Sequence, residues 1–144
     1  MRFIVQVCKE ASVMIDNEVI ARISKGEVVL VSFTNGDDEK IVDKMIDKLI
    51  KLRIFEDSNG LTNTNISSFN GEILAVSQFT LYADCKKGNR PNFTQAAKPD
   101  IANALYEFFV DYCKNLVPVV ETGIFGADMK VKLLNDGPFT IVLE

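Results

Sequence analysis

Two short polar segments of this 144-residue chain have the residue types of a reactive or binding site. The first is Ser77–Leu81, which reads SQFTL and follows directly on the apolar run Ile73–Val76. A buried strand that ends in hydroxyl and amide side chains is a common way for a rigid scaffold to present functional groups. A simpler role also fits, in which Ser77 and Thr80 only satisfy backbone groups at the strand end. Composition alone leaves both interpretations open.

The second segment is Asn135–Thr140, which reads NDGPFT. Asp-Gly is a strong turn signal and the following proline has a fixed φ, so a hairpin turn is the simplest interpretation. A bond before proline is cis in only about one case in twenty in folded proteins. The sequence therefore cannot reveal the isomer of the Gly137–Pro138 bond.

A third segment, Ala83–Phe93, combines cations with conformational freedom and an aromatic ring. Lys86, Lys87 and Arg90 supply the charge, and Gly88 lies between them. Such a loop can bind phosphates or a terminal base of a nucleic acid. It fits equally well a solvated charged loop with no ligand.

The absence of histidine limits the chemistry of any site. No side chain has an unperturbed pKa near neutrality, and mechanisms that need a histidine base or ligand are excluded. Ser77, Thr80 and Cys85 are potential nucleophiles, but no histidine can activate them. If the chain is an enzyme, its rate must come from substrate placement and from backbone N–H groups directed at developing charge.

Composition indicates a cytoplasmic protein without cofactors. Cys8, Cys85 and Cys113 are scattered, which favours neither a disulfide framework nor a metal site. No apolar run approaches the ~18 residues of a membrane span. The N-terminus alternates in polarity and does not resemble a secretory signal. The net charge of −4 argues against a grip on long nucleic acid, and any contact with RNA would need a local basic patch.

Periodicity predicts one α+β domain over residues 1–144. An amphipathic helix is expected from Ile41 to Ile50, after a cap at Asp37–Asp38. A second helix begins at Pro99 and ends before Pro118, with an apolar face of Ile101, Ala104, Leu105, Phe108, Phe109, Tyr112 and Cys113. Strands are predicted at Arg2–Val13, Glu18–Ile23, Val28–Phe33, Ile73–Val76, Met129–Leu133 and Phe139–Leu143, and Thr62–Asn70 is predicted to be loop.

The order of these elements predicts the type of sheet. Two main helices are too few for a repeating strand–helix–strand array, so a parallel sheet is not expected. We predict a curled, barrel-like, mainly antiparallel sheet with both helices packed against it.

Together, the two polar segments identify a family. Ser77–Leu81 resembles the SQxTL motif of D-aminoacyl-tRNA deacylases, and Asn135–Thr140 resembles their NxGPxT motif. The spacing between the motifs matches as well. Further similarity lies in Ala11–Val13, Arg53–Phe55, Gly88–Phe93 and Thr122–Phe125, so that the likeness covers essentially the whole chain.

The resemblance implies an enzyme that cleaves the ester of D-aminoacyl-tRNA, and of mischarged glycyl-tRNA, in translational proofreading. Backbone N–H groups around Gln78 and Phe79 would form the oxyanion site. Ser77 would help to shape the pocket, and Thr80 would have a supporting role. The terminal 2′-hydroxyl of the tRNA would assist attack by water.

The resemblance also implies a homodimer with active sites that span two subunits. Gly137 and Pro138 of one subunit, joined by a cis bond, would reach into the site of the other. The glycine carbonyl would hold the substrate's amino group, and the close backbone would exclude an L side chain. Ala102, Phe125 and Met129 would line the pocket for the terminal adenosine.

One residue departs from the family pattern. Val7 occupies a position where the family commonly carries arginine, so the Gly137–Pro138 element would lack the support of an arginine here. A non-catalytic module that binds an RNA end or a peptide is therefore one alternative function. Another is a related deacylase of altered chirality that edits L-alanine, although the Ser77–Thr80 residues favour the D-specific branch.

Overall fold

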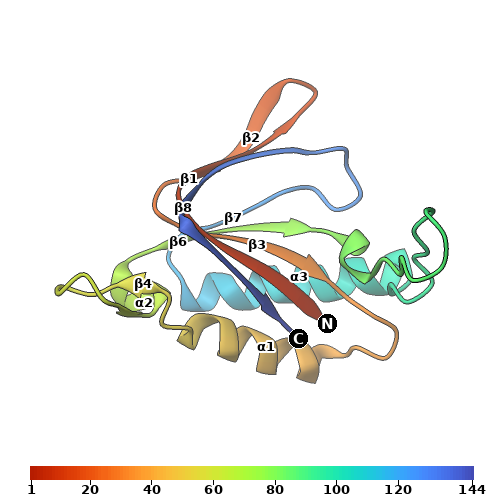
Figure 1. The fold of residues 1–144 in the computed structure, drawn as a ribbon, viewed down its shortest axis with the longest axis horizontal. Coiled ribbons are helices and arrows are strands. Elements are labelled where there is room, and N and C mark those ends of the chain that lie inside the picture. Colours follow the sequence, from red (N-terminus) through yellow and green to blue (C-terminus); the bar gives the residue numbers. More distant parts are fainter.

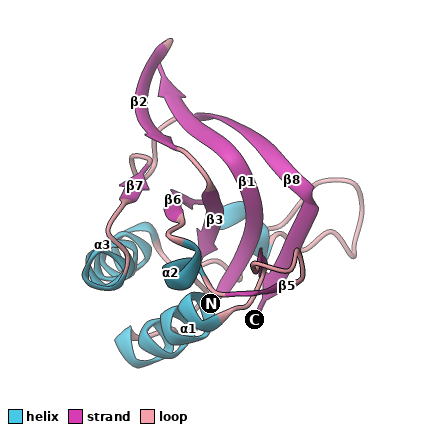
Figure 2. Cartoon of the chain, turned by 90° about the vertical axis from the view of Figure 1, so that its left-hand side faces the viewer, coloured by secondary structure: helices cyan, strands magenta, loops and turns pink.

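The structure, a computed structural model, describes residues 1–144. A curled six-stranded sheet forms its centre, with strand order β2-β1-β3-β6-β7 and with β8 along the remaining edge of β1 (Figures 1 and 2). The strands are β1 (Arg2–Ile15), β2 (Glu18–Ile23), β3 (Gly26–Ser32), β4 (Phe55–Glu56), β5 (Thr62–Thr64), β6 (Glu72–Ser77), β7 (Val120–Thr122) and β8 (Lys130–Leu143). The helices are α1 (Glu39–Lys51), α2 (Ile66–Phe69), the 3-10 turn η1 (Phe79–Tyr82) and α3 (Pro99–Leu116). None of the helices is both long and apolar enough to cross a bilayer.

Strand β1 produces the curl of the sheet. Its first half pairs with β3, its second half pairs with β2, and β8 runs along its other edge, all antiparallel. Pairing with β8 is irregular between Cys8 and Ala11, and such irregularities bend a strand. Phe3, Val5 and Val7 belong to one core cluster, whereas Cys8, Ala11 and Val13 belong to the other. The predicted barrel-like, mainly antiparallel sheet is confirmed.

Parallel pairing is more extensive than the sequence indicated. β6 lies between β3 and β7 and is parallel to both. The expectation against parallel strands was therefore wrong for these three strands. Parallel neighbours need a crossover connection, and α1 with α2 supplies the first crossover while α3 supplies the second. Two helices are enough for two crossovers.

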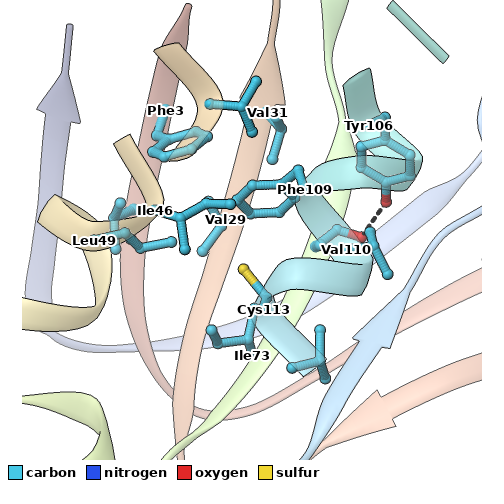
Figure 3. Packing of buried hydrophobic residues seen from close by; sticks show 14 of the residues in the cluster. Phe3, Val29, Val31, Ile46, Leu49, Ile73, Tyr106, Phe109, Val110 and Cys113 are labelled. Carbon is cyan, nitrogen blue, oxygen red and sulfur yellow. Dashed lines mark hydrogen bonds between the residues drawn. The ribbon is translucent and has the colours of Figure 1, made fainter. Parts of the chain in front are cut away.

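The main core lies between the sheet and helices α1 and α3. Figure 3 shows the Phe109 ring directed from α3 towards the sheet, with Ile46 and Leu49 of α1 nearby. The rings of Phe3 and Phe109 lie 5.2 Å apart, which ties α3 to β1. Asp38 caps α1 as predicted, since its side chain accepts a hydrogen bond from Ile41 N–H.

The buried face of α3 differs from the predicted one. Ile101 is 51 % exposed and Ala104 is also exposed, whereas Ala102, Tyr106 and Val110 are buried. The face therefore lies about one residue further round the helix than the strongest apolar residues suggested. Thr62–Asn70, predicted to be loop, contains β5 and the single turn α2, which Asn65 caps.

Candidate functional site

The Ser77–Thr80 segment lies where two parallel strands end together. The Gln78 N–H donates to the Val31 carbonyl at 2.8 Å, which fixes the end of β6 against the end of β3. The chain then turns into η1, so that the backbone changes direction at Gln78. Ligands of sheets with parallel strands commonly bind beyond the carboxyl ends of those strands.

Two backbone donors are available at this turn. The first bond of the turn runs from Leu81 N–H to the Gln78 carbonyl at 3.2 Å. The N–H groups of Phe79 and Thr80 precede that bond and have no acceptor within the turn. The Gln78 N–H, which was expected beside that of Phe79 in the oxyanion site, instead donates to the Val31 carbonyl, so that this part of the prediction was wrong. Phe79 and Thr80 are both exposed. This arrangement can bind a negatively charged oxygen.

The side chains of the segment support the turn. Gln78 Nε2 donates to Thr80 Oγ1, and Ser32 Oγ donates to the Phe79 carbonyl at 3.4 Å. The Thr80 hydroxyl is thereby tied to Gln78 within the turn, and its expected supporting role stays a prediction. Ser77 is half-buried at the strand end.

Arg2 is a site residue that sequence reasoning missed. Its guanidinium donates to the Leu81 carbonyl at 2.5 Å and lies 4.9 Å from the centre of the Tyr82 ring. It therefore holds η1 from the neighbouring end of β1. No sequence signal could have found Arg2, because its contacts lie about 80 positions away and depend on the sheet register.

The two cysteines in the core, Cys8 and Cys113, do not act as nucleophiles. Burial raises the pKa of Cys8 to about 11 and that of Cys113 to about 12, so both thiols stay protonated at neutral pH. Both residues are fully enclosed, at 2 % and 0 % exposure.

The Asn135–Thr140 segment is not a hairpin turn. It lies inside β8, which pairs with β1 on both sides of it, and the Gly137–Pro138 bond is cis. Cys8 pairs with Asn135 and Gln6 pairs with Thr140, so that four residues of β8 stand opposite Val7 alone. The excess residues form an exposed bulge.

Asn135 and Thr140 brace this bulge from its two ends. Asn135 Oδ1 accepts from the Phe139 N–H at 2.7 Å, and Asn135 Nδ2 donates to Thr140 Oγ1 at 3.1 Å. Gln6 Nε2 also donates to Thr140 Oγ1, at 3.3 Å. Gly137 has a φ of 137°, a conformation that favours glycine. The hydrogen bonds explain why the motif contains asparagine and threonine, and the φ angle explains its glycine.

The two motifs lie apart within one chain. Ser77 pairs with Val31, Val31 with Phe3 and Phe3 with Leu143, which puts three strand spacings between β6 and β8. At ~4.8 Å per spacing this is roughly 14 Å across the sheet. The bulge is also four residues further along β1, opposite Val7. The chain therefore does not bring Gly137 and Pro138 to its own Gln78.

Of the three residues expected to line the adenosine pocket, only Phe125 lines a hollow in the structure. A hollow of about 350 Å³ lies between α3 and the chain after β7, and Phe125, Tyr106 and Gly123 are among its lining residues. The rings of Tyr106 and Phe125 lie 6.1 Å apart. Ala102 is buried in α3 and Met129 packs on the second core cluster, and neither lines this hollow.

Tyr106 and Gly123 tie the hollow to the end of β6. The Tyr106 hydroxyl donates to the Ala75 carbonyl at 2.9 Å, and Gly123 N–H donates to the same oxygen at 3.0 Å. Burial raises the pKa of Tyr106 above its usual range, so that the hydroxyl stays a donor. A Cβ on Gly123 would lie 2.3 Å from Met129 Sδ, so the Met129 side chain would have to move if residue 123 were not glycine.

Comparison with known proteins identifies the family. A family profile described as D-Tyr-tRNA(Tyr) deacylase matches residues 4–144. The chain belongs to this family. The D-aminoacyl-tRNA deacylase of Lactobacillus acidophilus is 51 % identical over 144 residues, covering 100 % of this chain and 99 % of the relative. The D-aminoacyl-tRNA deacylase of Thermosipho africanus is 46 % identical, covering 100 % and 97 %.

Solved structures of similar proteins share the fold of this family member. One, described as c-Myc DNA Unwinding Element Binding Protein, aligns with a TM-score of 0.95 at 37 % identity, covering 100 % of this chain and 98 % of that one. A second, described as a probable eukaryotic D-amino acid tRNA deacylase, aligns with a TM-score of 0.87 at 18 % identity, covering 99 % and 97 %. The second likeness supports the fold alone.

Proposed function

We propose that this chain hydrolyses the ester bond of D-aminoacyl-tRNA and so removes D-amino acids from translation. Family membership over nearly the full length supports this function. The observation that carries the chemistry is the pair of N–H groups at Phe79 and Thr80, which begin η1 without an acceptor inside it. Because a tRNA ester is made and used where translation occurs, we expect the protein to act in the cytoplasm.

The reaction needs no side-chain base. Water attacks the ester carbonyl carbon, and the carbonyl oxygen becomes the negatively charged oxygen of a tetrahedral intermediate. The N–H groups of Phe79 and Thr80 stabilise that charge. Hydrogen bonds of this kind lower the energy of the intermediate more in a desolvated site than in water. Collapse breaks the bond to the 3′ oxygen of the ribose, which takes the proton that water loses. The neighbouring 2′-hydroxyl of the substrate assists this transfer, consistent with a chain without histidine.

The complete site is proposed to form between two copies of the chain. Gly137 and Pro138 are exposed on the bulge of β8 and lie away from Gln78 of the same chain. β8 is an edge strand of 14 residues, and its exposed apolar side chains include Leu134 and Val142, each at 55 % exposure. The unpaired backbone groups of such an edge can pair with another chain. A symmetric dimer would carry each bulge into the site of the partner.

The backbone of the bulge is proposed to distinguish the D form of the esterified amino acid from the L form. A main-chain wall at Gly137 and Pro138 leaves no room for a side chain of the L hand, whereas a D side chain points away from it. Selectivity then arises from a clash with the wrong substrate. Glycine has no side chain to clash, so glycyl-tRNA is also expected to be cleaved. Phe125 and the hollow beside Tyr106 are proposed to receive the terminal adenosine, whereas Ala102 and Met129 lie outside the lining of this hollow.

The test uses tRNA charged with matched enantiomers. Purified protein should release D-tyrosine from D-tyrosyl-tRNA and leave L-tyrosyl-tRNA intact. The variant Pro138→Ala should lose discrimination between the two, while Pro118→Ala, an exposed proline outside the bulge, should keep it. Equal cleavage of both esters by the parent protein would overturn chiral selection, and binding of charged tRNA without turnover would favour a binding module.

A further inference from the structure

The segment 84–98, here called the basic loop, has a charge opposite to that of the rest of the chain. It carries Lys86, Lys87, Arg90 and Lys98 against a single acid, Asp84. The remaining residues carry 12 basic and 19 acidic side chains. Lys86, Lys87 and Arg90 are all exposed, and none of them forms an ion pair. The loop is therefore a local cationic surface on an acidic protein.

The basic loop is closed by its own backbone bonds and is joined to the end of β3. At its start, Asp84 and Asn92 exchange backbone hydrogen bonds of 2.7 and 2.9 Å, which close the tip into a ring. At its end, Ala97 N–H donates to the Phe33 carbonyl at 3.0 Å, just after β3. In Figure 1 the loop projects beyond η1 at the end of the molecule from which α3 starts.

An aromatic contact connects the loop directly to the donor turn. The Phe93 ring packs edge-on against the Phe79 ring, with centroids 5.2 Å apart. Phe79 supplies one of the two free N–H groups, so this contact fixes the base of the basic loop against the turn at which the ester is proposed to bind. Asp84 forms no ion pair with the tip, and its Oδ1 accepts the backbone N–H of Lys86 at 2.9 Å.

We propose that the basic loop binds the backbone phosphates of the RNA strand that leads to the ester. The proposal rests on the proposed function and names how that site holds its substrate. An ester at the end of an RNA strand brings phosphates close behind it, and exposed lysine and arginine side chains bind phosphates without reading sequence. The loop would thus supply affinity for RNA, while the donor turn supplies the chemistry.

The test compares two triple variants that remove the same charge. The loop variant is Lys86→Ala/Lys87→Ala/Arg90→Ala. The control is Lys40→Ala/Lys44→Ala/Lys48→Ala, which removes three exposed lysines from α1. The loop variant should raise the KM for D-tyrosyl-tRNA by roughly tenfold or more. It should also flatten the dependence of log(kcat/KM) on log salt by about two units, since each phosphate contact to a single strand contributes ~0.7. The control should show neither effect.

A minimal substrate separates this proposal from the proposed function. D-tyrosyl-adenosine has the ester but no upstream phosphate, so the loop variant should cleave it at the parent rate. Equal KM values for D-tyrosyl-tRNA in the loop and control variants would overturn the role of the loop. If the parent cleaved neither substrate, the proposed function would fail, and the loop would be judged by fluorescence anisotropy of an uncharged acceptor-stem hairpin. Loss of hairpin binding in the loop variant alone supports the loop, and equal binding by both variants refutes it.

Discussion

At the residue scale, Glu27 is an acid placed inside the core. It has no exposed surface, and neither carboxyl oxygen has a hydrogen-bond partner in the protein. It pairs with Val7 in the β1–β3 register, the position where the family commonly carries arginine. Burial raises the pKa of Glu27 to about 8. The side chain is therefore largely protonated at pH 7, because an uncompensated buried charge would be costly.

This raised pKa predicts that stability falls as pH rises. The folded chain binds the Glu27 proton more tightly than the unfolded chain, whose ordinary pKa is 4.5. Between pH 4.5 and about 8 the free energy of unfolding should fall by up to about 1.4 kcal/mol per pH unit. Urea unfolding at one protein concentration, followed by circular dichroism from pH 5 to 8, measures this slope. Glu27→Gln should remove it, and parallel curves for the two proteins would contradict the prediction.

Phe79 offers a direct test of the backbone donor. Phe79→Pro deletes its N–H, and the first position of a helical turn tolerates proline. Gln78 has a φ of −145° and a ψ of 76°, outside the α region that a following proline disfavours. Removing one oxyanion donor should lower kcat for D-tyrosyl-tRNA by about 100-fold or more.

Phe79→Leu is the matched control, because it removes the ring and keeps the N–H. A kcat in Phe79→Pro equal to that in Phe79→Leu would exclude the Phe79 donor. Thermal unfolding of both variants shows whether η1 survives the change.

Residue types revealed the polar motifs but not all of their contacts. The SQFTL and NDGPFT segments stand out because hydroxyl, amide and glycine residues follow or interrupt apolar strands. The bulge could not be predicted, because Asp-Gly-Pro has the same signal whether the chain reverses or continues. Arg2 could not be predicted either, since its contacts with Leu81 and Tyr82 exist only once β1 lies beside β3.

At the element scale, Gly26 sets how closely β3 and β6 approach. A Cβ on Gly26 would lie 1.9 Å from the Glu72 carbonyl oxygen and 2.5 Å from its nitrogen. Because both atoms belong to the backbone, strands β3 and β6 would have to move apart to accommodate a side chain at position 26. Gly26→Ala should destabilise the protein by about 3 kcal/mol or more, at the upper end of overpacking effects.

The measurement is urea unfolding of Gly26→Ala beside Lys25→Ala. Lys25 is exposed, and its carbonyl bond to Glu72 N–H does not involve the side chain. The Lys25 variant should stay within about 0.5 kcal/mol of the parent. A Gly26 variant equally close to the parent would show that the strands are not held at this distance.

The helices and strands were easier to predict than the way in which they pair and pack. Asp16 and Asn17, with φ values of 49° and 65°, form the turn in the gap between the first two predicted strands, and the predicted cap Asp38 precedes α1. Pairing of β6 with β3 and β7 was missed, because strand periodicity contains no information on direction. The face of α3 was misplaced because large apolar residues such as Ile101 can also lie on a surface.

At the scale of the whole molecule, the central question is how separated motifs act together. The sheet fixes the bulge of β8 and the donor turn at different places in one chain. The basic loop lies near η1, whereas the exposed apolar residues lie along the edge strand β8. Two copies in a closed symmetric pair would bring the unlike regions together twice.

Mixed dimers provide the decisive experiment for this arrangement. One chain carries Phe79→Pro and the other Pro138→Ala, each with its own affinity tag, and two successive purifications isolate the mixed pair. If the bulge acts across the interface, one site of each mixed pair combines the intact turn of one chain with the intact bulge of the other. Such a pair should regain about half of the parent's D-selective activity, since one of its two equivalent sites is whole. If each chain used its own bulge, neither site would be whole and the mixed pair would be as defective as the two single variants, while light scattering at 16.0 kDa in place of twice that mass would exclude the dimer itself.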